Sequence, residues 1–136
     1  MRRIIALDIG TVRIGVAVSD PLGLFAQGLT VLQTKDDWKK DLADIVAKYQ
    51  NPMLLVGRPK RTDGSDGPEV ENIRRIVSEI LEVIPGLEVE YWDERFTTTI
   101  AQQTLIEADV SRANRKKKVD MIAATLILQN YLDRKV

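Results

Sequence analysis

Neither histidine nor cysteine occurs among the 136 residues of this chain, and the two absences exclude much of the usual catalytic chemistry. Without cysteine, disulfides and thiolate metal sites are excluded. Without histidine, Ser-His-Asp catalysis, Cys-His catalysis and histidine-bound zinc are excluded as well. Acid–base or metal chemistry must therefore use carboxylates, lysines, tyrosines or water, and carboxylate oxygens suit hard cations such as Mg²⁺ or Mn²⁺.

Long apolar runs and an excess of charge are also missing. No apolar run approaches the roughly 18 residues of a membrane span and no signal peptide opens the chain, so we expect a cytoplasmic protein with no membrane partner. Basic and acidic residues each number 20, which gives zero net charge, so nucleic-acid binding would depend on local basic patches. Aromatic residues make up only 5%, and the base-stacking surface of many single-strand binders is not evident.

The chain length and composition predict one globular domain over residues 1–136. Apolar alternation and short apolar runs predict strands at residues 3–9, 12–19, 25–32, 53–56 and 87–92. Helical spacing predicts helices at residues 38–49, 70–84, 97–108 and 117–134. The short link between the first two strands requires antiparallel pairing, whereas the later helical crossovers permit parallel pairing. This order predicts a three-layer α/β domain with a mixed sheet.

An acid, Asp8, stands inside the first apolar strand, in the segment 4–10. Removing an unpaired carboxylate from water costs several kcal/mol or forces it to bind a proton. We therefore expect a cation, a metal or a substrate to neutralise Asp8. A buried salt bridge would explain the residue too, and so would a phosphate-binding turn at Asp8-Ile9-Gly10 like that of sugar-kinase-like ATPases.

Two further acids could converge with Asp8 near one edge of the sheet. The fifth strand ends in Asp93-Glu94, at the edge where α/β sheets commonly place ligands, and strand alternation alone does not decide between these two. Asp120 is expected in the first turn of the last helix. Three such carboxylates with two divalent ions would support in-line phosphodiester hydrolysis without histidine. The simpler alternatives are a solvated strand end at Glu94 and a favourable helix-dipole position at Asp120.

Basic residues crowd the start of the last helix, just before Asp120, and a smaller group follows the fourth strand. Cations at a helix N-terminus oppose the dipole, so phosphate binding explains the larger group better than helix stability does. A solvated charged loop is the alternative. The predicted substrate-binding residues are Arg13, Arg58, Lys60, Arg61, Arg112, Arg115, Lys116, Lys117 and Lys118.

Several segments together carry a resemblance to a known family. They are residues 6–10 (ALDIG), 13–20 (RIGVAVSD), 63–68 (DGSDGP), 93–98 (DERFTT), 118–120 (KVD), 123–124 (AA) and 127–129 (ILQ), with Gly57, Pro59, Ala101 and Leu105 between them. In order and spacing these resemble the YqgF/RuvX family of bacterial RNase H-like nucleases, also called pre-16S rRNA nucleases or Holliday junction resolvases. The segments cover the chain nearly from end to end.

The resemblance implies an RNase H-like three-layer fold, with a central five-stranded mixed sheet flanked by helices. It implies catalytic, metal-binding acids at Asp8, Glu94 and Asp120, and it favours Glu94 over Asp93. It further implies a nuclease that uses Mg²⁺ or Mn²⁺ and matures the 5′ end of the 16S rRNA precursor in ribosome biogenesis. We expect nucleic acid as the partner, pre-rRNA before branched DNA, and a monomer or weak homodimer.

One departure from the family concerns the central loop. Many members carry an apolar-Asn-Met stretch there, where this chain has Lys60-Arg61-Thr62, so its substrate contacts could differ. Three alternatives stay open. A Holliday junction resolvase would apply the same chemistry to DNA and would need a dimer. A nucleotide-binding protein of the actin-like or hexokinase-like kind, or a non-catalytic nucleic-acid-binding module, would belong to another class.

Overall fold

A five-stranded mixed sheet forms the centre of the molecule. The computed structural model describes residues 2–58, 67–93 and 112–134, and of residues 112–120 only the backbone. The strands, in the sheet order β3-β2-β1-β4-β5, are β3 (Ala26–Gln33), β2 (Arg13–Ser19), β1 (Ile4–Ile9), β4 (Met53–Arg58) and β5 (Val89–Asp93). β2 pairs antiparallel with β1 and β3, whereas β4 pairs parallel with β1 and β5. The predicted five strands and mixed pairing are confirmed.

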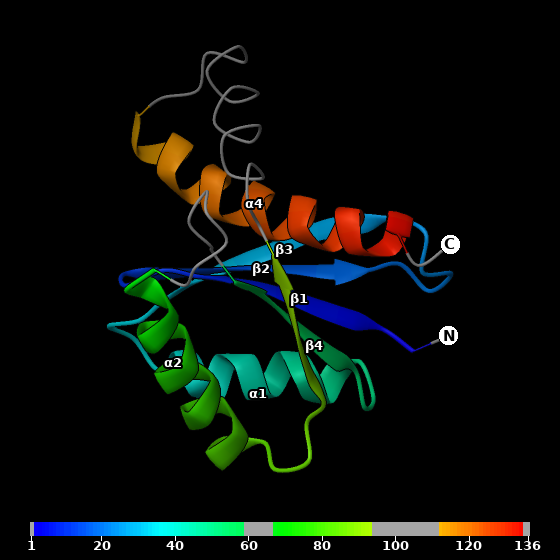
Figure 1. Ribbon diagram of the computed structural model, residues 1–136, viewed down its shortest axis with the longest axis horizontal. Helices are drawn as coiled ribbons and strands as arrows, with labels where there is room; N and C mark the ends of the chain where they lie inside the picture. The colour runs from blue at the N-terminus through cyan, green and yellow to red at the C-terminus, as the bar shows by residue number, and fades with distance from the viewer. Residues whose placement is uncertain (1, 59–66, 94–111, 135–136) are drawn as a thin grey trace.

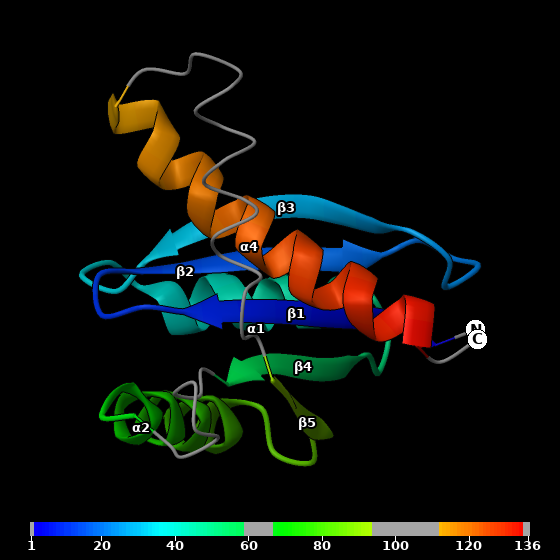
Figure 2. The same ribbon diagram turned by 45° about the horizontal axis from the view of Figure 1, so that its top comes forward.

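Helices cover both faces of this sheet (Figure 1). Helices α1 (Trp38–Lys48) and α2 (Glu69–Val83) lie on one face, and α4 (Arg112–Arg134) lies on the other. The carboxyl-terminal half of α4 runs across the sheet, while its amino-terminal turns rise away from it (Figure 2). None of the helices in the described part of the chain is long and apolar enough to cross a membrane.

Strand alternation divides the core into two layers. In β1, Ile5 and Leu7 face α1 and α2, whereas Ala6 faces α4. The layer under α4 contains several small side chains, among them Ala17 of β2 and Ala124 of α4, all without solvent exposure. Small residues on both sides let the helix approach the strands closely, which keeps α4 near the face on which Asp8 lies.

The last helix begins earlier than predicted. It starts at Arg112 and not near Lys117, so Asp120 lies in the third turn and no acid occupies the first turn. The early apolar spacing is weak because the first seven residues are mostly charged, and the periodic signal becomes clear only from Val119 onward. The predicted position of Asp120 in the first turn was therefore wrong. The helix predicted at 97–108 lies outside the described residues.

Candidate active site

Asp8 lies near the carboxyl end of β1, on the face that carries α4. Its neighbours Leu7 and Ile9 belong to the opposite core layer, and Ala6, two residues earlier, belongs to the α4 layer. Asp8 is half-buried, in contrast to the fully buried Ala6 and Leu7. The carboxylate thus combines partial removal from bulk water with an accessible position, as a metal or substrate ligand requires.

Glycines flank Asp8 on both neighbouring strands. Asp8 pairs with Gly15 of β2, and the parallel register that joins Leu7 to Val56 continues to Gly57 of β4. Neither glycine carries a side chain, so nothing on the adjacent strands rises beside the carboxylate on this face of the sheet. The sheet therefore leaves room around Asp8 for an ion, water or a phosphate.

A tight turn connects Asp8 to Arg13. The Gly10 amide donates to the Arg13 carbonyl at 2.9 Å, and a Cβ at Gly10 would lie only 3.0 Å from that oxygen. Arg13 begins β2, and alternation from Gly15 and Ala17 places it on the same face as Asp8. The structure thus brings two predicted site residues to one edge and one face of the sheet.

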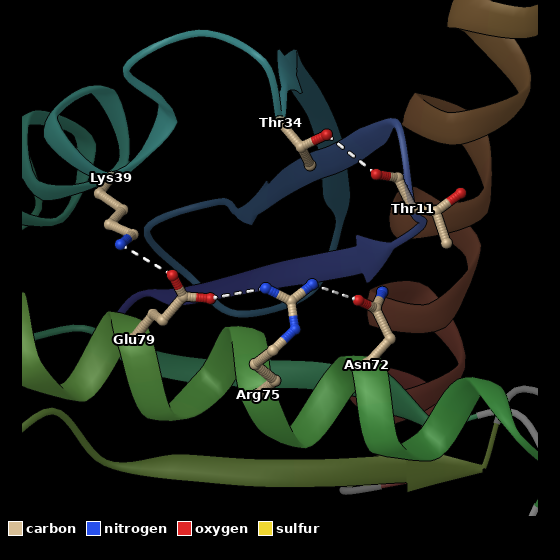
Figure 3. A network of polar contacts seen from close by, with 6 residues as sticks. All are labelled: Thr11, Thr34, Lys39, Asn72, Arg75 and Glu79. Atoms are coloured by element: carbon tan, nitrogen blue, oxygen red, sulfur yellow. Dashed lines mark hydrogen bonds and ion pairs between the residues drawn. The ribbon is translucent and has the colours of Figure 1, made fainter.

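Thr34, directly after β3, holds this turn in place (Figure 3). Its hydroxyl donates to the carbonyls of Thr11 at 2.9 Å and Val12 at 3.0 Å. Its amide also donates to the Val12 carbonyl at 2.9 Å. Sequence reasoning missed Thr34, because no local pattern indicates that the end of the third strand reaches the turn between the first two.

The contacts of strand β5 show which of its side chains face α4. The Tyr131 hydroxyl of α4 donates to Glu90 at 2.8 Å, and the Trp92 and Tyr131 rings meet edge to face at 5.4 Å between centroids. Glu90 and Trp92 therefore face α4, and alternation turns Asp93 to the opposite face. Asp93 thus does not share the face of Asp8, whereas Glu94, the next residue, lies outside the described residues.

Arg58 ends β4 at the same edge of the sheet but on the α2 face. It pairs in register with Asp93, and its guanidinium lies over the Tyr91 ring at 5.9 Å from the centroid. The structure therefore separates Arg58 from Asp8 and Arg13 by the thickness of the sheet. Lys60 and Arg61, which follow it in the predicted basic group, lie outside the described residues.

The other predicted site residues belong to α4. Asp120 lies one turn before Ala124, which is fully buried against the sheet. The structure describes only the backbone of the helix at the remaining predicted positions, which are Arg112, Arg115, Lys116, Lys117, Lys118 and Asp120 itself. Where side chains are described, no group of three or more histidine, cysteine or acidic residues forms a cluster fit to hold a metal. Of the three predicted ligands, only Asp8 falls in that part.

A polar cavity of about 460 Å³ opens on the opposite face, beside the turn that Thr34 holds. Glu79 of α2 forms ion pairs with Lys39 of α1, at 2.8 Å, and with Arg75, at 3.2 Å (Figure 3). Arg75 also donates a hydrogen bond to Asn72 at 2.7 Å. The hydrogen bond from Lys39 holds the pKa of Glu79 below its ordinary value. These contacts join α1 to α2, and the sequence carried no signal for them because they depend on how the two helices pack.

Comparison with known proteins gives consistent matches over the full chain. A family model described as RuvX, Holliday junction resolvase, matches residues 2–134. A Clostridium kluyveri protein named as a proposed pre-16S rRNA nuclease is 48% identical over 134 residues, covering 97% of both chains. A Streptococcus gordonii protein with that name is 47% identical over 137 residues, covering 97% of this chain and 98% of the relative. The Listeria monocytogenes counterpart is 45% identical over 135 residues, covering 96% and 97%.

Two solved structures with the same fold are resolvases of low sequence identity to this chain. T. thermophilus RuvC, in complex with a Holliday junction substrate, has a TM-score of 0.57 at 14% identity and covers 98% of this chain and 95% of its own. The Fowlpox virus resolvase in complex with Holliday junction DNA has a TM-score of 0.54 at 16% identity, with coverage of 98% and 99%. These likenesses confirm the predicted RNase H-like fold.

Proposed function

The chain belongs to the RuvX family, and on that premise we propose that it is a divalent-metal-dependent nuclease that processes the 5′ end of pre-16S rRNA. The membership itself makes it a phosphodiester hydrolase with an RNase H-like fold. The observation that carries the rest of the proposal is Asp8, a half-buried carboxylate between two glycines at the carboxyl end of the central strand. Ribosome biogenesis in the cytoplasm is the setting that this substrate implies.

The proposed metal ligands are Asp8, Glu94 and Asp120, which would hold Mg²⁺ or Mn²⁺. The position of Asp8 suits such an ion, because hard cations prefer carboxylate oxygens and the flanking glycines leave space for them. Asp120 fits by register, since Ala124, one turn later, is buried against the same face of the sheet. Glu94 fits better than Asp93, because Asp93 ends β5 on the opposite face.

Arg13 and the basic residues at 112–118 would have different roles, set by where they lie. When bound, the divalent ions would activate a water molecule and stabilise the leaving oxygen. Arg13, on the face of Asp8, would hold the phosphate on which the reaction takes place. The basic residues at 112–118 would bind the flanking backbone of the nucleic acid, where several charges along one helix suit successive phosphates.

The proposal is tested by offering precursor rRNA and a four-way DNA junction side by side, with Mg²⁺ or Mn²⁺. We expect the wild-type protein to cut the precursor near the 16S 5′ end, and Asp8→Asn to lose at least a thousandfold in rate because the amide is a poor ligand for a hard cation. Glu82→Gln, on the exposed side of α2, is the matched control and should cut normally. Isothermal titration with Mn²⁺ gives a second readout, in which Asp8→Asn alone should bind weakly.

Metal-dependent cleavage that persists in Asp8→Asn would contradict the assignment of the metal site. Cleavage of the DNA junction in preference to the precursor would instead favour resolvase activity, the second candidate. That candidate is supported by the RuvX family description and requires two active sites related by a two-fold axis. A protein that stays monomeric with its substrate would count against it.

A further inference from the structure

Strand β3 forms one edge of the sheet, with β2 as its neighbour on the inner side. The Thr34 amide donates to the Val12 carbonyl, and the register pairs Gln33 with Arg13. Because antiparallel pairs alternate between bonded and non-bonded positions, the peptide groups of Val31 and Gln33 turn away from β2. β3 therefore directs backbone amides outward at these two positions, as strands that accept a further strand do.

A groove of about 320 Å³ runs beside this edge, between β3 and α1. One wall is the stretch Thr30–Gln33 of β3, and the other carries Asp36, Asp41, Asp44 and Ile45. Among the residues whose side chains the structure describes, the lining contains three carboxylates and no basic residue. The basic side chains of α1 with defined contacts are engaged elsewhere, since Lys39 binds Glu79 and Lys48 lies over the Tyr49 ring.

The edge carries little of the protection that exposed strands normally have. β3 (AQGLTVLQ) contains neither lysine nor proline, the residues that most often block pairing at an edge. It does contain one irregularity, a register shift opposite Val16/Ala17 that leaves Leu29 as an extra residue. Because the shift interrupts the edge, the regular stretch available for pairing is Thr30–Gln33, the same stretch that lines the groove.

We propose that this β3–α1 groove binds a short, extended, basic segment of another protein by strand addition. The backbone of the segment would pair with Val31 and Gln33. Alternate side chains of an extended segment point to the same side, so lysines or arginines at every second position would reach Asp41 and Asp44 on α1. Charge therefore supplies the specificity, and backbone pairing supplies the orientation.

Charge also decides against two other occupants. A nucleic-acid strand would bring its phosphates against three carboxylates, which is unfavourable. A second copy of this chain paired edge to edge about a two-fold axis would bring the acidic sides of two α1 helices toward each other. A basic segment of a different protein is the occupant that the groove fits.

The groove lies on the α1 side of the sheet, whereas Asp8 lies on the α4 side. A segment docked along β3 would therefore leave the face of Asp8 open to the nucleic acid. The acidic lining and the exposed edge of β3 favour this occupant whichever nucleic acid the enzyme cuts.

The test uses the full chain and a synthetic peptide of four Lys-Val repeats, followed by two-dimensional NMR of the backbone amides. We expect saturable binding, with the largest shifts and slowed hydrogen exchange at Val31 and Gln33. The double variant Asp41→Asn/Asp44→Asn should weaken binding about tenfold or more. The exposed pair Glu82→Gln/Glu88→Gln, which removes the same charge elsewhere, should bind as the wild type does.

Two peptide controls separate strand addition from simple charge attraction. A Glu-Val repeat should not bind, and a Lys-Val repeat with proline at two central positions should bind at least tenfold more weakly, because proline lacks the amide hydrogen. Equal binding of the proline peptide, shifts confined to residues outside β3 and α1, or no binding at millimolar peptide would each overturn the proposal. So would a concentration-dependent dimer of the protein that shifts Val31 and Gln33 in the absence of peptide.

Discussion

Thr34 stabilises the turn after Asp8 although it follows β3, whereas Asp8 belongs to β1. Its hydroxyl donates to two carbonyls of the turn, and the Gly10 amide closes the same turn on Arg13. The turn carries Arg13 on the face of Asp8. If Arg13 binds phosphate as proposed, Thr34 would act as a positioning residue, with its effect on the reaction passing through Arg13.

Thr34→Val keeps the side-chain shape and removes both hydroxyl bonds. We expect kcat/KM for the nucleic acid to fall about tenfold, equivalent to about 1.4 kcal/mol, mainly through a higher KM because Arg13 is less well placed for phosphate. Thr34→Ser should restore most of the loss. Steady-state kinetics on both variants check this, and a serine variant as weak as the valine variant would show that the hydroxyl is not responsible.

Asp20 organises the exposed loop between β2 and β3. Its carboxylate accepts the amides of Leu24 at 2.7 Å and Phe25 at 3.0 Å, and the hydrogen bond from Phe25 is the main cause that lowers the pKa of Asp20 below its ordinary value of 3.8. The side chains of Leu22 and Phe25 are 69% and 66% exposed. Hydrogen bonds from the backbone to the Asp20 carboxylate, together with those between Gln129 and the backbone of Leu24 and Ala26, hold this loop, whose apolar side chains are exposed.

The pKa of Asp20 gives a pH dependence with a defined sign. Because the folded pKa is lowered, the stabilisation is complete well above pH 3.8 and is lost as the pH falls through the lowered value. We expect Asp20→Asn to lower the urea midpoint at pH 7, and the gap to the wild type to narrow at pH 3 and below. NMR titration of the carboxyl carbon should place the Asp20 midpoint below 3.8, and a midpoint at or above it would contradict this reading.

At the scale of elements, α4 and β3 approach each other closely at Gly28. A Cβ at that position would lie 2.8 Å from Met121 Cγ and 3.3 Å from Thr125 Oγ1. Contacts this short force a neighbour to shift. Gly28 therefore sets how near the middle of α4 can lie to the edge of the sheet.

Gly28→Ala should destabilise the fold by about 1–3 kcal/mol, because the added methyl group overpacks this contact. Urea denaturation measures the loss. Met121→Ala removes the side chain that the methyl group meets, so the double variant should be more stable than the sum of the two single effects predicts. Strict additivity would show that the methyl group acts through something other than Met121.

The bounds of helices and strands were predicted well where apolar residues recur at a regular interval. They were predicted poorly where charged residues hide that interval. β1 and β2 are confirmed to within a residue, because Ile5, Leu7, Val16 and Val18 alternate cleanly. α4 was placed five residues late, since its start is mostly charged and only its later turns are apolar. Helix α2 was predicted well because Val70, Ile73, Val77 and Ile80 all face the core.

For the candidate site, the sequence predicted residues but not the faces of the sheet on which they lie. Asp8 and Arg13 were both predicted, yet only strand pairing brings them to one face. Arg58 was predicted with Lys60 and Arg61 as a basic group after the fourth strand, but it ends β4, and alternation along that strand turns it to the other face. Thr34 and the Lys39–Glu79–Arg75 contacts depend on packing between distant segments, which local pattern does not encode.

At the scale of the whole molecule, the sheet separates two kinds of surface. The face covered by α4 carries Asp8 and Arg13, and the sequence at the start of α4 is basic, whereas the α1 side carries the acidic groove along β3. Net charge is zero because the whole chain has 20 basic and 20 acidic residues, but these are not spread evenly over the surface. Zero net charge thus conceals a polar distribution in which nucleic acid and a basic protein segment would approach from different sides.

Helix α4 is long enough that a small change in its angle moves its amino-terminal end appreciably. Its carboxyl-terminal half packs against the sheet around Ala124, while the basic positions near Arg112 lie about 18 Å farther along the axis, at 1.5 Å per residue. A tilt of about 5° about Ala124 would move the amino-terminal end of α4 by about 1.6 Å, enough to misplace a proposed phosphate contact. Substitutions under α4, far from any reacting atom, should therefore alter substrate binding through the angle of a single helix.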